Sequence, residues 1–168
     1  MINKIKNFVK LNNLDGYIVP KNDEYFNEYI HSSKDRLKFI SKFSGSAGFA
    51  IITKNKNYLF VDGRYTIQAN SESGKKFKIF TIPKKFPKDV IKTKKKIVLG
   101  FDPKLHTEKQ LNFLFKIKNI TLRSIKQNLV DLIWIRKSKT LLKPFYKISQ
   151  KNSGMTSSKK IDQIKKIL

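Results

Sequence analysis

Apolar positions along the chain change their spacing repeatedly, and each change marks an expected element of secondary structure. Residues 1–13 carry apolar side chains at helical spacing, which predicts an amphipathic opening helix. Short apolar runs bounded by Gly, Pro, Asn or Asp predict strands. These runs are 14–20, 49–53, 58–61, 77–82, 97–101 and 120–125. Helical spacing returns between them at 37–43, 65–73, 87–90 and 111–115, and again after Asn128, which we expect to cap a helix containing Val130, Ile133 and Trp134.

Strand and helix alternate throughout this pattern, which predicts an α/β fold. The runs 49–53 and 58–61 are separated only by Lys54-Asn-Lys-Asn57, a spacing typical of a β-hairpin. Because a hairpin pairs its strands antiparallel, the sheet cannot be purely parallel. We therefore expect a mixed β-sheet flanked by helices.

The pattern changes near the end of this alternation. Residues 1–136 are predicted to form the first domain, and residues 137–156, which are polar and basic, a linker. Residues 157–168 then carry a new apolar helical face made of Ile161, Ile164 and Leu168. A single amphipathic helix of this length is marginal in water. We expect it to be the first helix of a missing second domain, or to contact another copy of the chain in a homo-oligomer.

Composition narrows the class of protein. The chain has 168 residues, of which 39% are hydrophobic, including 13 Phe, so it is too apolar to be disordered. It has no cysteine, which excludes disulfides, zinc–thiolate sites and thiol nucleophiles. No stretch approaches the ~20 apolar residues of a membrane helix, and lysines interrupt the N-terminal segment, unlike a signal peptide. We expect a cytoplasmic protein without a membrane partner.

The net charge of +25 raises the alternative of a basic, non-enzymatic nucleic-acid-binding protein. Residues 75–168 carry 26 basic and 5 acidic groups, and Lys94–Lys96 and the tail could follow a phosphate backbone. Only four of the 37 basic residues are arginine, the side chain that best recognises phosphate and guanine. Charge runs are also usually solvated surfaces. We therefore expect only weak, non-specific polyanion binding.

The chain offers no complete catalytic motif. His31 and His106 are far apart and stand in no metal-binding spacing, so we expect both to lie in solvent-facing positions without a role. Asp23, Glu24 and Glu28 are the only acidic grouping, and we expect a solvated turn and helix face there. No catalytic residue, metal ligand or cofactor is assigned to this chain.

Two segments deserve a functional interpretation. Phe43–Gly48 combines glycines with small side chains, so it could cradle an anion or simply form a tight turn before a strand. Arg64 follows a predicted strand end, where it could project toward a docked carboxylate or peptide carbonyl. The competing interpretation is a surface ion pair between Arg64 and Asp62.

These segments, in order and spacing, resemble the creatinase-type N-terminal domain of Xaa-Pro aminopeptidases (aminopeptidase P). The residues that carry the resemblance are Leu14–Pro20, Glu28–Ile30, Arg36–Ile40, Phe43–Gly48, Thr53–Tyr65 and Gln68–Ala69, followed by Asn128–Asp131 with Ile133–Trp134. Ser158–Ile164 is similar to the first helix of that family's next domain.

The resemblance implies a ribonuclease H-like mixed sheet and a role in removing the residue that precedes proline at a peptide's N-terminus. It implies two divalent metals, commonly manganese, bound by a C-terminal catalytic domain. That domain would be missing here or supplied in trans, so the chain alone is expected to be inactive, as a truncated or split product. It also implies that Arg64 contacts the peptide substrate in a complete enzyme. His31 departs from the family's usual small or apolar residue.

Overall fold

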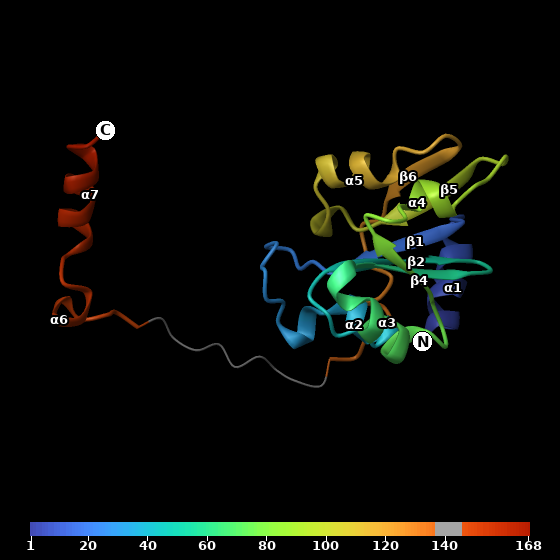
Figure 1. Ribbon diagram of the computed structural model, residues 1–168, viewed down its shortest axis with the longest axis horizontal. Coiled ribbons are helices and arrows are strands. Elements are labelled where there is room, and N and C mark those ends of the chain that lie inside the picture. Colours follow the sequence, from blue (N-terminus) through green and yellow to red (C-terminus); the bar gives the residue numbers. More distant parts are fainter. Residues whose placement is uncertain (137–145) are drawn as a thin grey trace. The chain divides into compact units, whose positions relative to one another are not determined.

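The computed structural model describes residues 1–136 and 146–168 (Figure 1). The chain divides into two compact units, Met1–Lys137 and Ser138–Leu168.

The first unit is built on one six-stranded sheet. Its strands are β1 (Gly16–Pro20), β2 (Gly48–Thr53), β3 (Asn57–Asp62), β4 (Lys78–Ile82), β5 (Ile97–Phe101) and β6 (Ile120–Ser124). They lie in the order β4-β3-β2-β1-β5-β6. β2 is antiparallel to both of its neighbours, whereas the β3–β4, β1–β5 and β5–β6 pairs are parallel. Five strands therefore run in one direction and β2 runs against them, so the predicted mixed sheet is confirmed, as is the hairpin of β2 and β3.

Helices cover both faces of this sheet. They are α1 (Ile2–Leu11), α2 (Arg36–Ser41), α3 (Thr66–Ser73), α4 (Pro87–Val90) and α5 (Glu108–Phe115), with single 3-10 turns at η1 (Ser32–Lys34), η2 (Gly63–Tyr65) and η3 (Pro103–Leu105). Side chains that alternate along the strands form two buried clusters. One cluster joins Ile5 of α1 and Leu37 of α2 to the sheet, and the other joins Leu111 and Phe115 of α5 to it. This two-faced burial explains the nearly continuous apolar runs in the sequence.

One local prediction was wrong. The segment after Asn128 forms turns instead of a helix. The Asn128 side chain accepts from Val130 N at 2.9 Å, as the predicted cap would, and Trp134 N donates to Val130 O at 3.0 Å, but these turns do not continue into a helix. The capping residue of α2 is Asp35, whose carboxylate accepts from Lys38 N, and Ser32 begins η1.

The second unit contains α6 (Gln150–Ser153) and α7 (Ser157–Lys165). α6 lies inside the predicted linker, of which residues 137–145 are outside the described part of the chain. α7 begins where a helix was predicted, and Thr156 caps it. Its apolar side chains Ile161 and Ile164 are about half exposed. Over the described residues, no helix is long and apolar enough to cross a membrane.

Candidate functional site

The carboxyl ends of the parallel strands form the candidate site. β1, β3 and β4 end here at Pro20, Asp62 and Ile82, and β2, running the other way, begins here at Gly48. A pocket of about 340 Å³ opens among these four residues, with Phe49 and Phe115 on its apolar wall. Ligands of open α/β sheets bind outside the carboxyl ends of the strands, because the connecting loops leave crevices there.

Arg64 lies in η2, directly after β3 at this edge. Its backbone N–H and its Nε both donate to Asp62 Oδ1 at 2.9 Å. These hydrogen bonds lower the pKa of Asp62 and raise the pKa of Arg64 above its ordinary value. The Arg64 side chain is nevertheless 71% exposed. The ion pair expected from the sequence is therefore present, but the terminal Nη donors make no hydrogen bond to any described residue and face solvent.

The small-residue segment Phe43–Gly48 is held in place by α3. Ser44 donates to Glu72 through both its backbone N–H (2.8 Å) and its hydroxyl (2.6 Å), and Ser46 Oγ lies 2.8 Å from Tyr65 Oη. Neither glycine of the segment has a positive φ. A Cβ at Gly48 would lie 2.7 Å from the Phe60 carbonyl oxygen, so close packing requires glycine there. The tight-turn interpretation is the one that the geometry favours.

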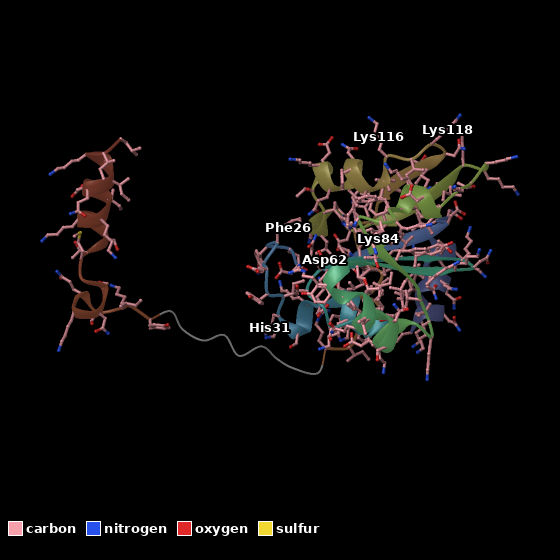
Figure 2. The ribbon with its side chains drawn as sticks, in the orientation of Figure 1. Phe26, His31, Asp62, Lys84, Lys116 and Lys118 are labelled. Carbon is pink, nitrogen blue, oxygen red and sulfur yellow. The ribbon has the colours of Figure 1, made fainter. Side chains whose placement is uncertain are left out.

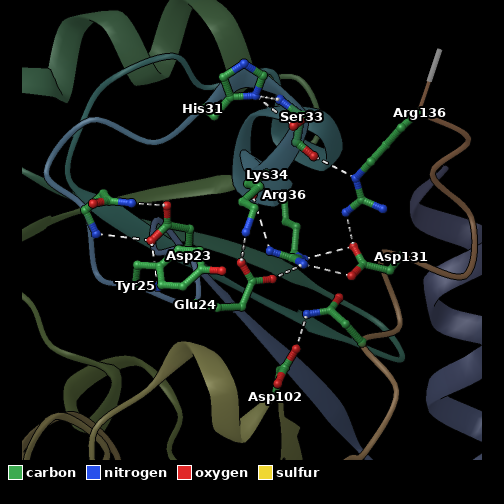
Figure 3. Close-up of polar contacts among 12 residues, drawn as sticks. Asp23, Glu24, Tyr25, His31, Ser33, Lys34, Arg36, Asp102, Asp131 and Arg136 are labelled. Atoms are coloured by element: carbon green, nitrogen blue, oxygen red, sulfur yellow. Dashed lines mark hydrogen bonds and ion pairs between the residues drawn. The ribbon is translucent and has the colours of Figure 1, made fainter. Parts of the chain in front are cut away.

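The acidic grouping at 23–28 was misjudged as solvated. Asp23 is 1% exposed, and its carboxylate accepts from the backbone N–H groups of Tyr25 and Asn27 and from the Asn27 side chain (Figure 3). Glu24 accepts from Lys34 Nζ at 2.8 Å and from Arg36 Nη2 at 2.7 Å. Burial alone would raise the pKa of Glu24, but these hydrogen bonds hold it at about 2. Of these three carboxylates, only Glu28 is exposed, as expected.

Arg36 is the centre of a buried clamp that sequence reasoning did not find. It is 4% exposed, and its Nε and Nη2 donate to the two oxygens of Asp131 at 2.9 and 2.8 Å (Figure 3). Arg136 donates to Asp131 and to the carbonyl of Ser33, both at 2.6 Å. These bonds tie residues 128–136 to the loop before α2. No local sequence pattern links Arg36 to Asp131, because 95 positions separate the two residues in the chain.

The two histidines differ from each other in burial. His31 is exposed, as predicted, and its Nδ1 accepts from the Ser33 N–H. His106 was expected to face solvent, but it is mostly buried and lines the 340 Å³ pocket. Burial lowers the pKa of His106 below its ordinary value, and its Nδ1 lies 3.0 Å from the Asp102 carbonyl oxygen. His106 directly follows η3, which begins two residues after β5 ends.

The candidate residues thus fall into separate groups. Asp62 and His106 line the edge pocket and Arg64 pairs with Asp62, whereas Asp23 and Glu24 brace a neighbouring loop. Figure 2 shows Asp62 at the same end of the sheet as the loop that carries Phe26 and His31. Among residues 1–136 and 146–168, no three His, Asp or Glu side chains come together in a way that could hold a metal ion.

Comparisons with known proteins place most of this chain in one family. Residues 1–132 match the family model described as Creatinase/Prolidase N-terminal domain. A protein of Coprinopsis cinerea named "Probable Xaa-Pro aminopeptidase P" is 31% identical, over 96% of this chain and 27% of that relative. A protein of Laccaria bicolor with the same name is 34% identical, over 78% of this chain and 22% of that relative. The chain therefore spans only about a quarter of the length of these relatives.

Solved structures agree. The X-prolyl aminopeptidase of Caenorhabditis elegans, described as a cytosolic enzyme with a di-nuclear active site, superposes with a TM-score of 0.77 at 29% identity, covering 92% of this chain and 27% of that chain. The N-terminal domain of the cytoplasmic peptidase PepQ from Mycobacterium tuberculosis has a TM-score of 0.57 at 19% identity, covering 79% and 97%. This second likeness shows the fold alone. The comparisons give no support to the nucleic-acid-binding alternative.

Proposed function

This chain belongs to the creatinase/prolidase N-terminal domain family, and we propose that it serves as the N-terminal, substrate-positioning domain of an Xaa-Pro aminopeptidase. The observation that carries the proposal is identity of about 30% to Xaa-Pro aminopeptidases over nearly the whole chain. Because the chain matches only 27% of those proteins, the complete activity belongs to a longer assembly. We place that assembly in the cytosol, following the description of the C. elegans enzyme.

The proposed role of Arg64 follows from its surroundings. Its guanidinium is charged at every physiological pH and offers four N–H donors at the two Nη atoms. Its one ion-pair partner among the described residues is Asp62, which lines the edge pocket. Such a group binds a peptide carbonyl or carboxylate through directed hydrogen bonds. Arg64 would therefore orient the peptide while another domain cleaves it.

The divalent metals implied by the resemblance do not fit the described residues, which bring no three ligands together. Bond cleavage by a metal-activated hydroxide is the chemistry those ions would supply in a separate catalytic domain. The contribution assigned to this chain is limited to holding and orienting the peptide. A binding contribution of this kind appears in kcat/KM, because it stabilises the bound substrate and the transition state relative to the free enzyme.

Two assays test the proposal. The purified chain, mixed with an Xaa-Pro peptide and manganese, is expected to release no amino acid above the blank. A chimera that carries this chain in place of the matching region of the C. elegans enzyme is expected to hydrolyse the same peptide. Turnover by the isolated chain, or an inactive chimera that is folded and binds manganese, would contradict a purely positioning role.

The chimera also tests Arg64 directly. Arg64→Ala should lower kcat/KM by about 10- to 100-fold, the usual range for one hydrogen bond to a charged group. The matched control is Arg123→Ala, which removes an exposed arginine that donates to the backbone carbonyl of Asn12. If both variants lose the same activity, Arg64 does not contact the substrate.

A further inference from the structure

A hollow of about 410 Å³ lies at the end of the sheet opposite to the edge pocket. Asn57, the first residue of β3, lines this hollow, whereas Asp62, the last residue of that strand, lines the edge pocket. The start of α1 also borders it, and Figure 1 marks the N-terminus beside α3. Four of the side chains that line this lysine hollow are Lys6, Lys42, Lys75 and Lys76. Of the described residues that line it, none is Asp or Glu.

Lysine is common throughout the chain, so two other hollows serve as references for the lysine hollow. The edge pocket is lined by one lysine, Lys21, and by one carboxylate, Asp62. A hollow of about 260 Å³ is lined by two lysines and two carboxylates, namely Lys21, Lys38, Glu28 and Asp35. Carboxylates match lysines in number at both places. The uncompensated charge of the lysine hollow is therefore a local feature and does not follow from the composition alone.

The backbone around the lysine hollow is held in place, although its lysines are unpaired. None of the four lysines forms an ion pair with any described residue. Ser73 Oγ donates to the Ser41 carbonyl at 2.9 Å, a buried bond that joins the ends of α3 and α2. Asn57 Nδ2 donates to the Lys76 carbonyl at 3.0 Å. Because these bonds exist before any ligand arrives, little backbone freedom is lost when an anion binds.

We propose that the lysine hollow is a binding site for a diphosphate group. Like charges that converge on one hollow repel each other, and an anion among them removes that repulsion. A phosphate group carries about −1.5 to −2 charges at pH 7, so two such groups neutralise four ammonium groups. The first turn of α1 adds a partial positive charge, because it has neither a side-chain cap nor an acidic residue. This site does not depend on the proposed function, since Arg64 and Asp62 take no part in it.

Titration of inorganic pyrophosphate into the complete, 15N-labelled chain tests the site. The salt concentration is about 0.15 M, at which charges more than ~8 Å apart are largely screened. We expect saturable shifts of the Lys42 and Lys76 amide signals, with a Kd on the order of 0.1–1 mM. Inorganic phosphate should bind at least about tenfold more weakly, because it carries about half the charge. No saturation by about 10 mM pyrophosphate, or equal affinity for the two anions, would overturn the proposal.

Two matched double variants separate a site from the general attraction of a basic chain. Lys75→Gln with Lys76→Gln, and Lys94→Gln with Lys95→Gln, each remove two positive charges from adjacent exposed lysines. Only the first pair lines the lysine hollow. The first variant should weaken pyrophosphate binding about tenfold and the second less than about twofold. Equal losses would show non-specific attraction only. The amide spectrum confirms that each variant is folded.

ADP distinguishes the two sources of a diphosphate group. Tighter binding of ADP than of pyrophosphate would identify a nucleoside diphosphate as the ligand, and the reverse order a free diphosphate. Both orders support the proposal if the variant at Lys75 and Lys76 weakens the binding of both probes. Binding of both probes that this variant leaves unchanged would overturn it.

Discussion

Arg36 and Arg64 both lie in segments that leave the carboxyl edge of the sheet, but they have opposite surroundings. Arg36 is 4% exposed and shares its guanidinium between Asp131 and Glu24. Arg64 is 71% exposed and contacts one carboxylate two residues away in the chain. The first arginine joins distant segments of the fold and has no capacity left for a ligand. The second is oriented by its neighbour but keeps donors free, which is the condition for recognising a substrate.

The residues around Arg36 are also more tightly packed than those around Arg64. Trp134 stacks on Phe39 at a centroid distance of 4.7 Å, and the Arg136 Cζ lies 4.6 Å from the centroid of the Trp134 ring. In the turn of Arg64, the Arg64 Cζ lies 5.4 Å from the centroid of the Tyr65 ring, and the Arg64 side chain remains exposed. Substitutions in the clamp should therefore change stability, whereas substitutions in the turn should change function alone.

The largest effect is expected for Arg36→Ala. It should lower the free energy of unfolding by about 2–4 kcal/mol, because Asp131 and Glu24 lose the cation that they share. Urea unfolding followed by fluorescence is suitable, since the single tryptophan, Trp134, lies inside the clamp. A loss below about 1 kcal/mol, the value of a surface pair, would show that the clamp does not hold the domain together.

Acid should weaken the clamp through Glu24. Its pKa is about 2 in the folded chain against an ordinary value of 4.5, so the folded state favours the ionised form. The resulting stabilisation is complete above about pH 5 and is lost as the pH falls toward 2, on the order of 2–3 kcal/mol. Wild type should thus lose more stability than Glu24→Gln over this interval. Parallel stability curves for the two proteins would refute the assignment.

Substitution of two glycines compares the Phe43–Gly48 segment with the Arg64 turn. Gly48→Ala places a Cβ 2.7 Å from the Phe60 carbonyl oxygen, and we expect a loss of about 1–3 kcal/mol. Gly63→Ala meets nothing closer than 3.8 Å and needs no positive φ, so it should be tolerated. Thermal or urea unfolding of both variants is sufficient. A strongly destabilised Gly63→Ala would mean that the Arg64 turn is as constrained as the Phe43–Gly48 segment.

The smallest effect is expected for Arg64→Ala and Asp62→Asn in the isolated chain. Both side chains are exposed, and each loses only the other as a partner. The urea midpoint should therefore match that of wild type within error, while the chimera loses activity. A clear loss of stability in either variant would place Arg64 with Arg36 as a structural residue.

Much of the fold could be read from the sequence because its signals are local. Short apolar runs and the turn residues between them act within a few positions, and the structure reproduces the strands that they predict. The segment after Asn128 failed because its conformation is decided elsewhere. Its apolar spacing is compatible with a helix, but Asp131 and Trp134 are held by Arg36 and Phe39 of α2.

The sequence by itself determined the α/β class, the hairpin and the position of Arg64 at a strand end, since periodicity and turn chemistry are properties of neighbouring residues. Only the tertiary structure decided which charged groups are buried and which remain free. Asp23 was expected in solvent and is buried, and His106, also expected in solvent, is part-buried and lines the edge pocket. Burial depends on what packs against a residue from far along the chain, and no local pattern records that.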